Sequence, residues 1–347
     1  MRLTPEHRIA LLMHEGTQSP RGKTGLAMLR YSQFPVVAVI DHDCAGQSLA
    51  AVAGIAKQIP IVASVEDALA FGPDVLAIGI APSGGALPAP WLQEVKQAIN
   101  AGLCVVNGLH TPMAQDLEMT RTLNPGQWIW DVRQEPPSLQ VGSALAQTLQ
   151  CRRVLTVGTD MSVGKMSTNL ELHRASLKRG LRSKVIATGQ TNLMLGDDGI
   201  PLDAVRVDFA SGAVEQQVMR YGPDHDILYI EGQGSLLNPA STATLPLLRG
   251  AQPTHLILVH RAGQTHIRNC PQIPVPPLPK VIHLYETVAT AAGAFSFTKV
   301  VGIALNTGDL DQGEAAIAIQ STQAATGLPC TDVFRFGPTP LLEAILA

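Results

Sequence analysis

The chain of 347 residues has little charge and few aromatic residues. Charged residues make up 15% of the sequence and aromatic residues 4%, whereas hydrophobic residues make up 46%. With a formal net charge of −3, the chain has no basic field that would attract a polyphosphate backbone, so we expect no nucleic-acid partner. The abundance of small aliphatic residues is instead typical of layered α/β domains, which commonly act on small molecules.

Cysteines and long apolar runs are also scarce. The cysteines are odd in number, widely spaced and without a CxxC pair, which argues against structural zinc or a redox dithiol: Cys44, Cys104, Cys151, Cys270 and Cys330. No run of about 18 apolar residues predicts a membrane span, and the first apolar run is too short and too charged for a signal peptide. We therefore expect a cytoplasmic protein without a membrane partner.

Several catalytic signatures are missing as well. The sequence contains no GxSxG elbow and no HExxH pair, which argues against a serine hydrolase and a zinc hydrolase. The apolar run VVAVID ends in Asp41, where a Rossmann domain would place the acid that binds a ribose, but no GxGxxG precedes it. A nicotinamide cofactor is therefore disfavoured.

Short apolar runs alternate with helical stretches throughout the chain. This rhythm predicts βαβ crossovers and parallel sheets, with ligands at the carboxyl ends of the strands. The paired prolines in QEPPSLQ (134–140) interrupt the rhythm, and a helix over about 141–150 is expected to lead into a new strand. We predict a Rossmann-like domain over residues 1–140 and a P-loop NTPase-like parallel-sheet domain over residues 141–347.

One segment in the second half departs from this rhythm. RNCPQIPVPPLPK (268–280) contains five prolines, which exclude a helix or a central strand and favour an extended conformation. A surface connection or a subunit contact is favoured over a lid, and a subunit contact would imply a homo-oligomer. In the first half, APSGG (81–85) is expected to line a crevice or to form a tight turn capped by Ser83.

The stretch GTDMSVGKMST (158–168) resembles a phosphate-binding loop. It follows the apolar strand RRVLTVG and opens a helix, so the free amides and positive end of that helix would face an anion. Gly158 and Gly164 would let the backbone close around a phosphate that Lys165 reaches. Thr159 and Asp160 complete the loop, and a simple strand-to-helix turn is the alternative.

A carboxylate follows a later strand. ILYIEGQGSLLNP places Glu231 where a P-loop protein has the acidic residue that orients magnesium. The motifs GTDMSVGK, IEGQGS and VVGIALN resemble those of dethiobiotin synthetase and related P-loop proteins. The resemblance implies a metal-binding role for Glu231 and a position near the nucleotide base for Asn306.

One residue departs from the P-loop pattern. The position after the loop lysine, normally Ser or Thr for magnesium, is Met166. Thioether sulfur is a poor ligand for a hard cation. Either Ser167 serves as the metal ligand through a one-residue shift, or the loop holds phosphate without catalytic magnesium, which points towards coenzyme A instead of ATP.

A broader resemblance covers nearly the whole chain. The sequences ATGQTN, PLDAVRVDFASG, EGQGSLLNP, LILVH, IAPSGG and GLH together resemble a family of two-domain proteins, formerly of unknown function, with a Rossmann-like front and a P-loop back. Some members are D-glutamate or D-amino-acid N-acetyltransferases that use acetyl-CoA beside an epimerase. The resemblance implies acetyl transfer from acetyl-CoA to a small acidic D-amino acid.

Polar groups at predicted strand ends supply candidate catalytic residues. His260 is our candidate base because it ends a strand near the P-loop and titrates near neutral pH. Arg261 could pair with a substrate carboxylate, and Gln190 also ends a strand. A hydrogen-bonded structural histidine is the alternative for His260.

A second segment with a similar Gly-Thr…Gly-Lys pattern, GTQSPRGKT (16–24), lies near the N-terminus. It lacks a matching carboxylate strand, and Pro20 removes one backbone donor, so a helix start is favoured over an anion site. Two other functions stay open for the chain. One is a ligase or kinase that uses ATP with Mg²⁺, in the manner of dethiobiotin synthetase, and the other is a nucleotide sensor without chemistry.

Overall fold

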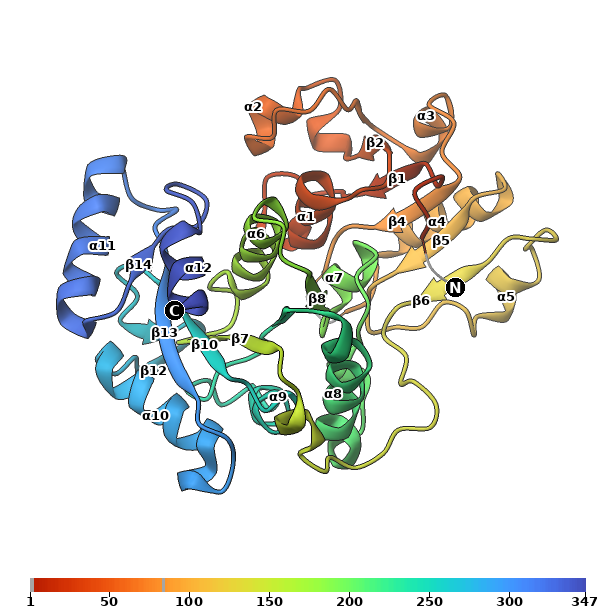
Figure 1. Ribbon diagram of the computed structural model, residues 1–347. Helices are drawn as coiled ribbons and strands as arrows, with labels where there is room; N and C mark the ends of the chain where they lie inside the picture. Colours follow the sequence, from red (N-terminus) through yellow and green to blue (C-terminus); the bar gives the residue numbers. More distant parts are fainter. Residues whose placement is uncertain (1–2, 83–84) are drawn as a thin grey trace. The chain divides into compact units, whose positions relative to one another are not determined.

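The computed structural model describes residues 3–82 and 85–347, and it divides into two compact units. The first unit is Met1–Gln134 with Gln190–Asp197, and the second is Glu135–Gly189 with Asp198–Ala347. Figure 1 labels the elements of both. Ser83 and Gly84, within the turn expected at 81–85, lie outside the described residues. The boundary at residues 140 and 141 stays a prediction.

The first unit contains a parallel six-stranded sheet of order β3-β2-β1-β4-β5-β6. This is the strand order of a Rossmann fold, which confirms the predicted fold class. Its central strands are wholly apolar and buried, as expected where helices cover both faces. The strands are β1 (Ile9–Leu12), β2 (Val36–Ile40), β3 (Ile61–Val62), β4 (Val75–Ile78), β5 (Cys104–Asn107) and β6 (Ile129–Asp131).

Helices connect these strands. The α-helices are α1 (Lys23–Tyr31), α2 (Leu49–Ala53), α3 (Val65–Leu69), α4 (Ala89–Asn100), α5 (Leu117–Thr120) and α7 (Gln190–Met194). Helices α3 and α4 pack against one another and against β2 and β5. Helix α7 packs against α1, where the Thr24 and Thr191 hydroxyl oxygens lie 3.0 Å apart. A segment from the middle of the chain thus completes the first unit.

The second unit contains a parallel sheet of order β14-β13-β10-β7-β9-β8. Strand β7 lies inside the sheet between β10 and β9, so the chain that leaves β7 is flanked by two other strand ends. This arrangement confirms the predicted P-loop-like sheet. The strands are β7 (Arg152–Gly158), β8 (Ser183–Ile186), β9 (Ile227–Ile230), β10 (His255–Arg261), β13 (Lys299–Asn306) and β14 (Cys330–Thr331).

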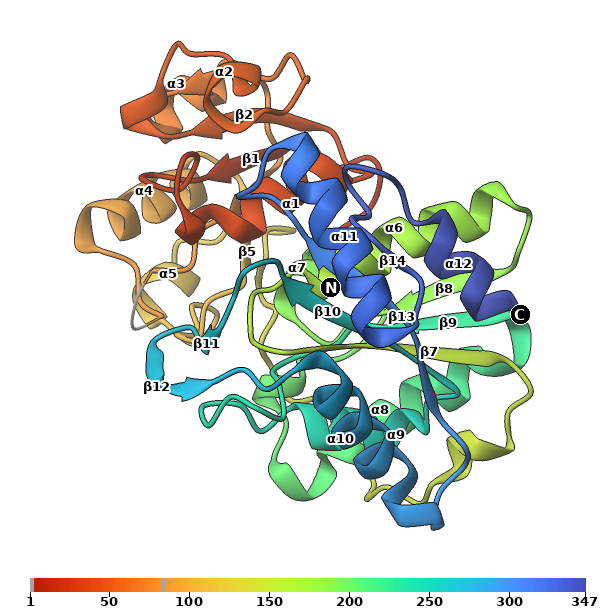
Figure 2. The same cartoon turned by 90° about the vertical axis from the view of Figure 1, so that its left-hand side faces the viewer.

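Helices cover both faces of this second sheet, as Figure 2 shows. Helices α6 and α12 lie on one face and α8, α9 and α10 on the other, while α11 packs at the β14 edge. Their bounds are α6 (Lys165–Lys178), α8 (Val207–Tyr221), α9 (Thr244–Ala251), α10 (Leu278–Thr290), α11 (Gln312–Thr326) and α12 (Thr339–Leu346). A capping box of Asp311 and Glu314 begins α11, and Gly327 ends it with a φ of 69°.

Two predicted segments differ from the structure. The helix expected over 141–150 is only a 3-10 turn, Leu145–Thr148. The proline-rich segment forms β12 (Cys270–Pro274), which pairs with β11 (His266–Ile267) in a separate antiparallel ribbon. Its last prolines begin α10, because proline is tolerated in a first helical turn. The exclusion of a helix was therefore wrong from Leu278 onward.

No disulfide joins the cysteines of this architecture, all of which the structure describes. Among the residues described, no helix combines the length and apolarity needed to cross a bilayer. All five cysteines carry free thiols, three of them buried. Stability therefore comes from the apolar packing of the two sheets.

Candidate functional site

The P-loop joins β7 to α6 in the second unit. Ser162 and Gly164 have φ values of 56° and 120°, in the region that favours glycine. Gly164 is the N-cap of α6, and no described side chain caps the helix there. The first amides of α6 therefore keep their donors for an external anion, and the helix dipole favours negative charge at this point.

Lys165 is held inside the loop. Its side chain is only 6% exposed, and Nζ donates a hydrogen bond of 2.7 Å to the Asp160 carbonyl oxygen. A Cβ on Gly158 would lie 3.0 Å from this Nζ, which explains why a residue without a side chain is needed there. The ammonium group thus lies within the curve of the loop, where a phosphate would meet it.

The Asp160 side chain anchors the loop. Its carboxylate accepts hydrogen bonds from the Asn238 and Gln264 side chains (2.8 and 2.7 Å) and from the Arg268 and Met161 amides (both 2.7 Å). Burial alone would raise the pKa of Asp160, but these four donors outweigh it and lower the pKa. The carboxylate is therefore a structural anion that ties the P-loop to the β11–β12 ribbon.

Glu231 follows β9 directly beside the P-loop strand. Its Oε2 accepts the amides of Thr188 and Gly189 at 2.9 and 3.0 Å. The next residue is Gly232, where a Cβ would collide with the Thr156 carbonyl oxygen and approach the Lys165 side chain. The EG-x-G motif thus brings the Glu231 backbone close to Lys165, while half of the carboxylate is occupied by backbone amides.

The first turn of α6 offers little to a metal ion. Met166 is 8% exposed and belongs to the buried core. The Thr168 hydroxyl donates to the Gly164 carbonyl oxygen at 3.0 Å. Ser167, the next residue, is half-buried. The position directly after the loop lysine therefore supplies no hydroxyl for magnesium.

His260 contacts the P-loop from the end of β10. Its Nδ1 lies 2.9 Å from the Thr159 hydroxyl oxygen. Burial lowers the pKa of His260 to about 4, so the ring is neutral at physiological pH and one ring nitrogen keeps a lone pair. Arg261, the next residue, donates from Nη1 to Asp309 Oδ2 at 2.7 Å. Its charge is paired within the protein before any substrate arrives.

Asn306 ends β13 on the other side of β10. Its Nδ2 donates to the Val163 carbonyl oxygen at 3.0 Å, so the amide supports the P-loop directly. A small cleft opens beside it, and its lining includes Gly164, Asp332 and Phe334. The accessible volume of this cleft is only about 20 Å³, so the position of Asn306 near a nucleotide base stays a prediction.

The remaining predicted residues lie in the first unit. The prediction that Gln190 ends a strand was wrong, because β8 ends at Ile186 and Gln190 is the first residue of α7. In the front loop the Thr17 amide donates to Asp41 Oδ2 at 3.1 Å, and Ser19 caps the 3-10 turn Pro20–Gly22 that leads into α1. The loop is thus the helix start that the sequence favoured, with a carboxylate of the protein on one of its amides.

Supporting residues were missed by sequence reasoning. Tyr285 on α10 is fully buried, and its hydroxyl donates to the Gly158 carbonyl oxygen at 2.7 Å while accepting the Leu236 amide at 3.1 Å. Asn238 and Gln264 hold Asp160, as described above. These residues are 78 to 127 positions away from their partners, and no local sequence signal marks them.

A Rossmann sheet combined with a parallel sheet that carries a P-loop between β7 and α6 defines a two-domain P-loop protein. The chain belongs to the DUF1611 family. The family's C-terminal model, described as a P-loop domain of unknown function, matches residues 140–342. Its N-terminal model, described as a Rossmann-like domain, matches residues 42–135.

Curated and solved relatives cover most of the chain. A D-glutamate N-acetyltransferase from Tritonibacter scottomollicae is 36% identical over 286 residues, which are 82% of this chain and 84% of that protein. A D-glutamate N-acetyltransferase from Pseudoalteromonas sp. is 33% identical over 79% of this chain and 82% of that protein. The crystal structure of a DUF1611 family protein from Anabaena variabilis has a TM-score of 0.96 and 63% identity, and the match covers 98% and 99% of the two chains.

Proposed function

We propose that this protein is a cytoplasmic N-acetyltransferase that moves the acetyl group of acetyl-CoA to the amine of a small acidic D-amino acid such as D-glutamate. The observation that carries the proposal is the 36% identity, over 82% of the chain, to a protein named D-glutamate N-acetyltransferase. The free thiols are in keeping with a reducing compartment.

The P-loop supplies the donor site in this proposal. Coenzyme A carries phosphates, and the uncapped N-terminus of α6 and the Lys165 ammonium are the groups that would hold them. Holding these phosphates needs no catalytic metal, which agrees with Met166 in the position where magnesium-dependent P-loops have a hydroxyl. The amides of α6 and the Lys165 ammonium would neutralise the phosphates.

The reaction needs a base for the amine proton and polar groups that hold the charged substrate in place. The substrate nitrogen attacks the thioester carbonyl carbon, the C–N bond forms, and the C–S bond breaks. The proton lost from nitrogen passes to the base and the thiolate leaves with coenzyme A. We assign the base to His260, which is neutral above about pH 4 and lies at Thr159 of the loop. Arg261 is our candidate for holding a substrate carboxylate. Gln190 stays a candidate catalytic residue without an assigned contact.

An assay with free amino acids tests the proposal. Incubated with acetyl-CoA, the protein should release CoA thiol fastest with a D-isomer and form N-acetyl-D-glutamate, identified by mass spectrometry after chiral separation. His260→Gln should lower the rate about a hundredfold or more, because general-base catalysis contributes about 10²–10⁴. Burial lowers the pKa of His260 to about 4. In a plot of rate against pH, the decrease in rate caused by protonation of this base should therefore lie near pH 4 instead of near 6.5.

His255→Gln is the matched control. His255 lies at the opposite end of the same strand, its Nδ1 is 2.7 Å from the Thr254 hydroxyl oxygen, and burial lowers its pKa as well. Its replacement should leave turnover unchanged. Folded protein that binds acetyl-CoA but acetylates no amino acid of either hand would refute the acetyl-transfer proposal and favour a nucleotide sensor. A full rate in His260→Gln would refute only the assignment of the base.

A ligase or kinase that uses ATP with magnesium is the second candidate, because Glu231 directly follows β9, which pairs with the P-loop strand β7, as the metal-orienting acid of P-loop enzymes would. Ser167 would then be the hydroxyl ligand. Chelating magnesium should leave the binding of acetyl-CoA unchanged, and Glu231→Gln should lower that affinity less than tenfold, as calorimetry would measure. Tight binding of ATP that depends strictly on magnesium and releases phosphate would establish the second candidate instead.

A further inference from the structure

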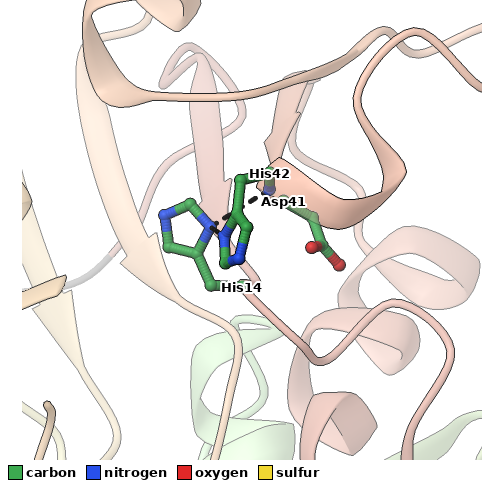
Figure 3. A group of neighbouring side chains, drawn as sticks. All are labelled: His14, Asp41 and His42. Atoms are coloured by element: carbon green, nitrogen blue, oxygen red, sulfur yellow. Dashed lines mark hydrogen bonds between the residues drawn. The ribbon is translucent and has the colours of Figure 1, made fainter. Parts of the chain in front are cut away.

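A second cluster of polar side chains lies in the first unit, at the carboxyl ends of two neighbouring strands. His14 follows β1, and Asp41 and His42 follow β2 directly. The potential ligand atoms of these three side chains all lie within 4.8 Å of one another. Figure 3 shows the His14 and His42 imidazoles side by side, with Asp41 next to His42. None of these residues belongs to the P-loop site.

Both imidazoles are oriented by carboxylates through the same ring nitrogen. His14 Nε2 lies 2.7 Å from Glu94 Oε1, and the Glu94 carboxylate also accepts the Val65 amide at 2.9 Å. His42 Nε2 lies 3.2 Å from Asp43 Oδ1. Carboxylates that accept the second N–H of an imidazole are the usual partners of metal-binding histidines, because they fix the tautomer and the ring orientation.

This orientation leaves the two Nδ1 atoms facing each other. They are 2.8 Å apart, and the His42 amide donates a hydrogen bond of 3.2 Å to His14 Nδ1, which a metal ion at this nitrogen would replace. When each Nε2–H donates to its carboxylate, each Nδ1 carries a lone pair. Two lone pairs at this distance repel each other unless a cation, either a proton or a metal ion, lies between them. His14 is 2% exposed, so water cannot relieve this repulsion from all sides.

Asp41 adds a buried negative charge to the cluster. Its side chain is fully buried and accepts the amides of Glu15, Thr17 and Asp43 at 3.1 to 3.3 Å. These bonds are long for a carboxylate, which can accept about four hydrogen bonds. The Cys44 thiol also hydrogen-bonds to Asp41. A thiol is a weak donor, so a cation beside the two imidazoles would ligate the carboxylate by displacing it.

We propose that His14 Nδ1, His42 Nδ1 and an Asp41 oxygen bind one divalent transition-metal ion, with Zn²⁺ as the matching probe. Two imidazoles and a carboxylate suit zinc, and three protein ligands leave a fourth position for water or a substrate. Tetrahedral Zn–N bonds of about 2.0–2.1 Å place two nitrogens about 3.3 Å apart. The His42 side chain, 46% exposed on a 3-10 turn, can open the Nδ1 pair by that half ångström.

Metal titration of the full chain tests this site independently of acetyl transfer. Metal-free protein should bind one equivalent of Zn²⁺ by calorimetry and one of Co²⁺ with visible d–d absorption, and Zn²⁺ should raise the melting temperature. His42→Ala should weaken Zn²⁺ at least tenfold and abolish the rise. The control His283→Ala, which removes an exposed histidine from α10, should bind as the wild type does.

X-ray absorption of the wild-type zinc complex provides a measurement that needs no variant. Two imidazoles and otherwise oxygen in the first shell would support the site. Sulfur in that shell would overturn it, because Cys44 lies next to Asp41 and is the nearest competing ligand. The proposal would also be overturned if the protein bound no stoichiometric Zn²⁺, or if wild type and His42→Ala bound Zn²⁺ with equal affinity. The close approach of the two Nδ1 atoms would then be explained by a proton that the two rings share.

Discussion

At the scale of single residues, buried histidines make the free energy of unfolding depend on pH. His173 on α6 places Nδ1 2.7 Å from the Ser183 hydroxyl oxygen, and burial, with Lys184, Arg174 and His225 adding repulsion, lowers its pKa to about 4. In the unfolded chain a histidine titrates near 6.5. Between these pH values the unfolded state binds a proton that the folded state refuses, so acid favours unfolding.

The free energy of unfolding should therefore decrease as the pH falls from about 6.5 towards 4. The effect of His173 is absent above about pH 6.5 and should reach the order of 3 kcal/mol near pH 4, since the pKa differs by about 2.5 units and one unit corresponds to about 1.4 kcal/mol. His173→Gln should flatten this part of the profile, as urea denaturation at successive pH values would measure. An unchanged slope in the variant would show that His173 does not carry it.

At the scale of elements, the two Gly-Thr loops look alike in sequence but end differently. The loop before α6 leaves the helix start uncapped, with Lys165 inside the curve. In the loop before α1, Ser19 caps a 3-10 turn that runs into the helix, the Thr17 amide contacts the Asp41 carboxylate, and Lys23 is exposed. Of these two loops, the later one has the buried lysine that a phosphate would meet.

Lys165→Ala should weaken the phosphate-bearing ligand at least tenfold, because a charge-assisted contact contributes about 1.5–3 kcal/mol. The matched change in the other loop, Lys23→Ala, should alter the affinity less than twofold. Calorimetric titration with acetyl-CoA and with ATP measures both. The opposite ranking of the two variants would transfer the anion site to the front loop.

Sequence patterns correctly predicted those strands and helices whose conformation is determined by neighbouring residues in the chain. The buried strands and the helix after the P-loop follow from apolar runs and glycines. The segment 141–150 does not, because its conformation depends on a distant partner: Glu215 of α8 accepts the Ser143 and Leu145 amides, and Ala144 has a φ of 57°. These amides bond to a carboxylate instead of to a helix of their own, which no local pattern reveals.

At the scale of the whole molecule, the succession of strands and helices was enough to predict two parallel α/β sheets. The P-loop and its neighbouring strand ends could also be predicted, because parallel strands bring their carboxyl ends to one edge. The internal bonds of Asp160 and Arg261 could not be, since their partners lie in other loops. The pairing of His14 with His42 is a further case, because it depends on the register of β1 beside β2.

The placement of α7 has a consequence for dividing the gene. Residues 190–197 lie between two stretches of the second unit in the sequence, but they pack as part of the first unit. Met194 in this segment is fully buried. A truncated gene that begins at residue 135 would produce the second unit with a helix whose apolar side chains have lost their packing. A gene that stops at residue 134 would lack the same helix. Separating the units as recombinant modules therefore requires transplanting residues 190–197 onto the first and bridging the gap in the second.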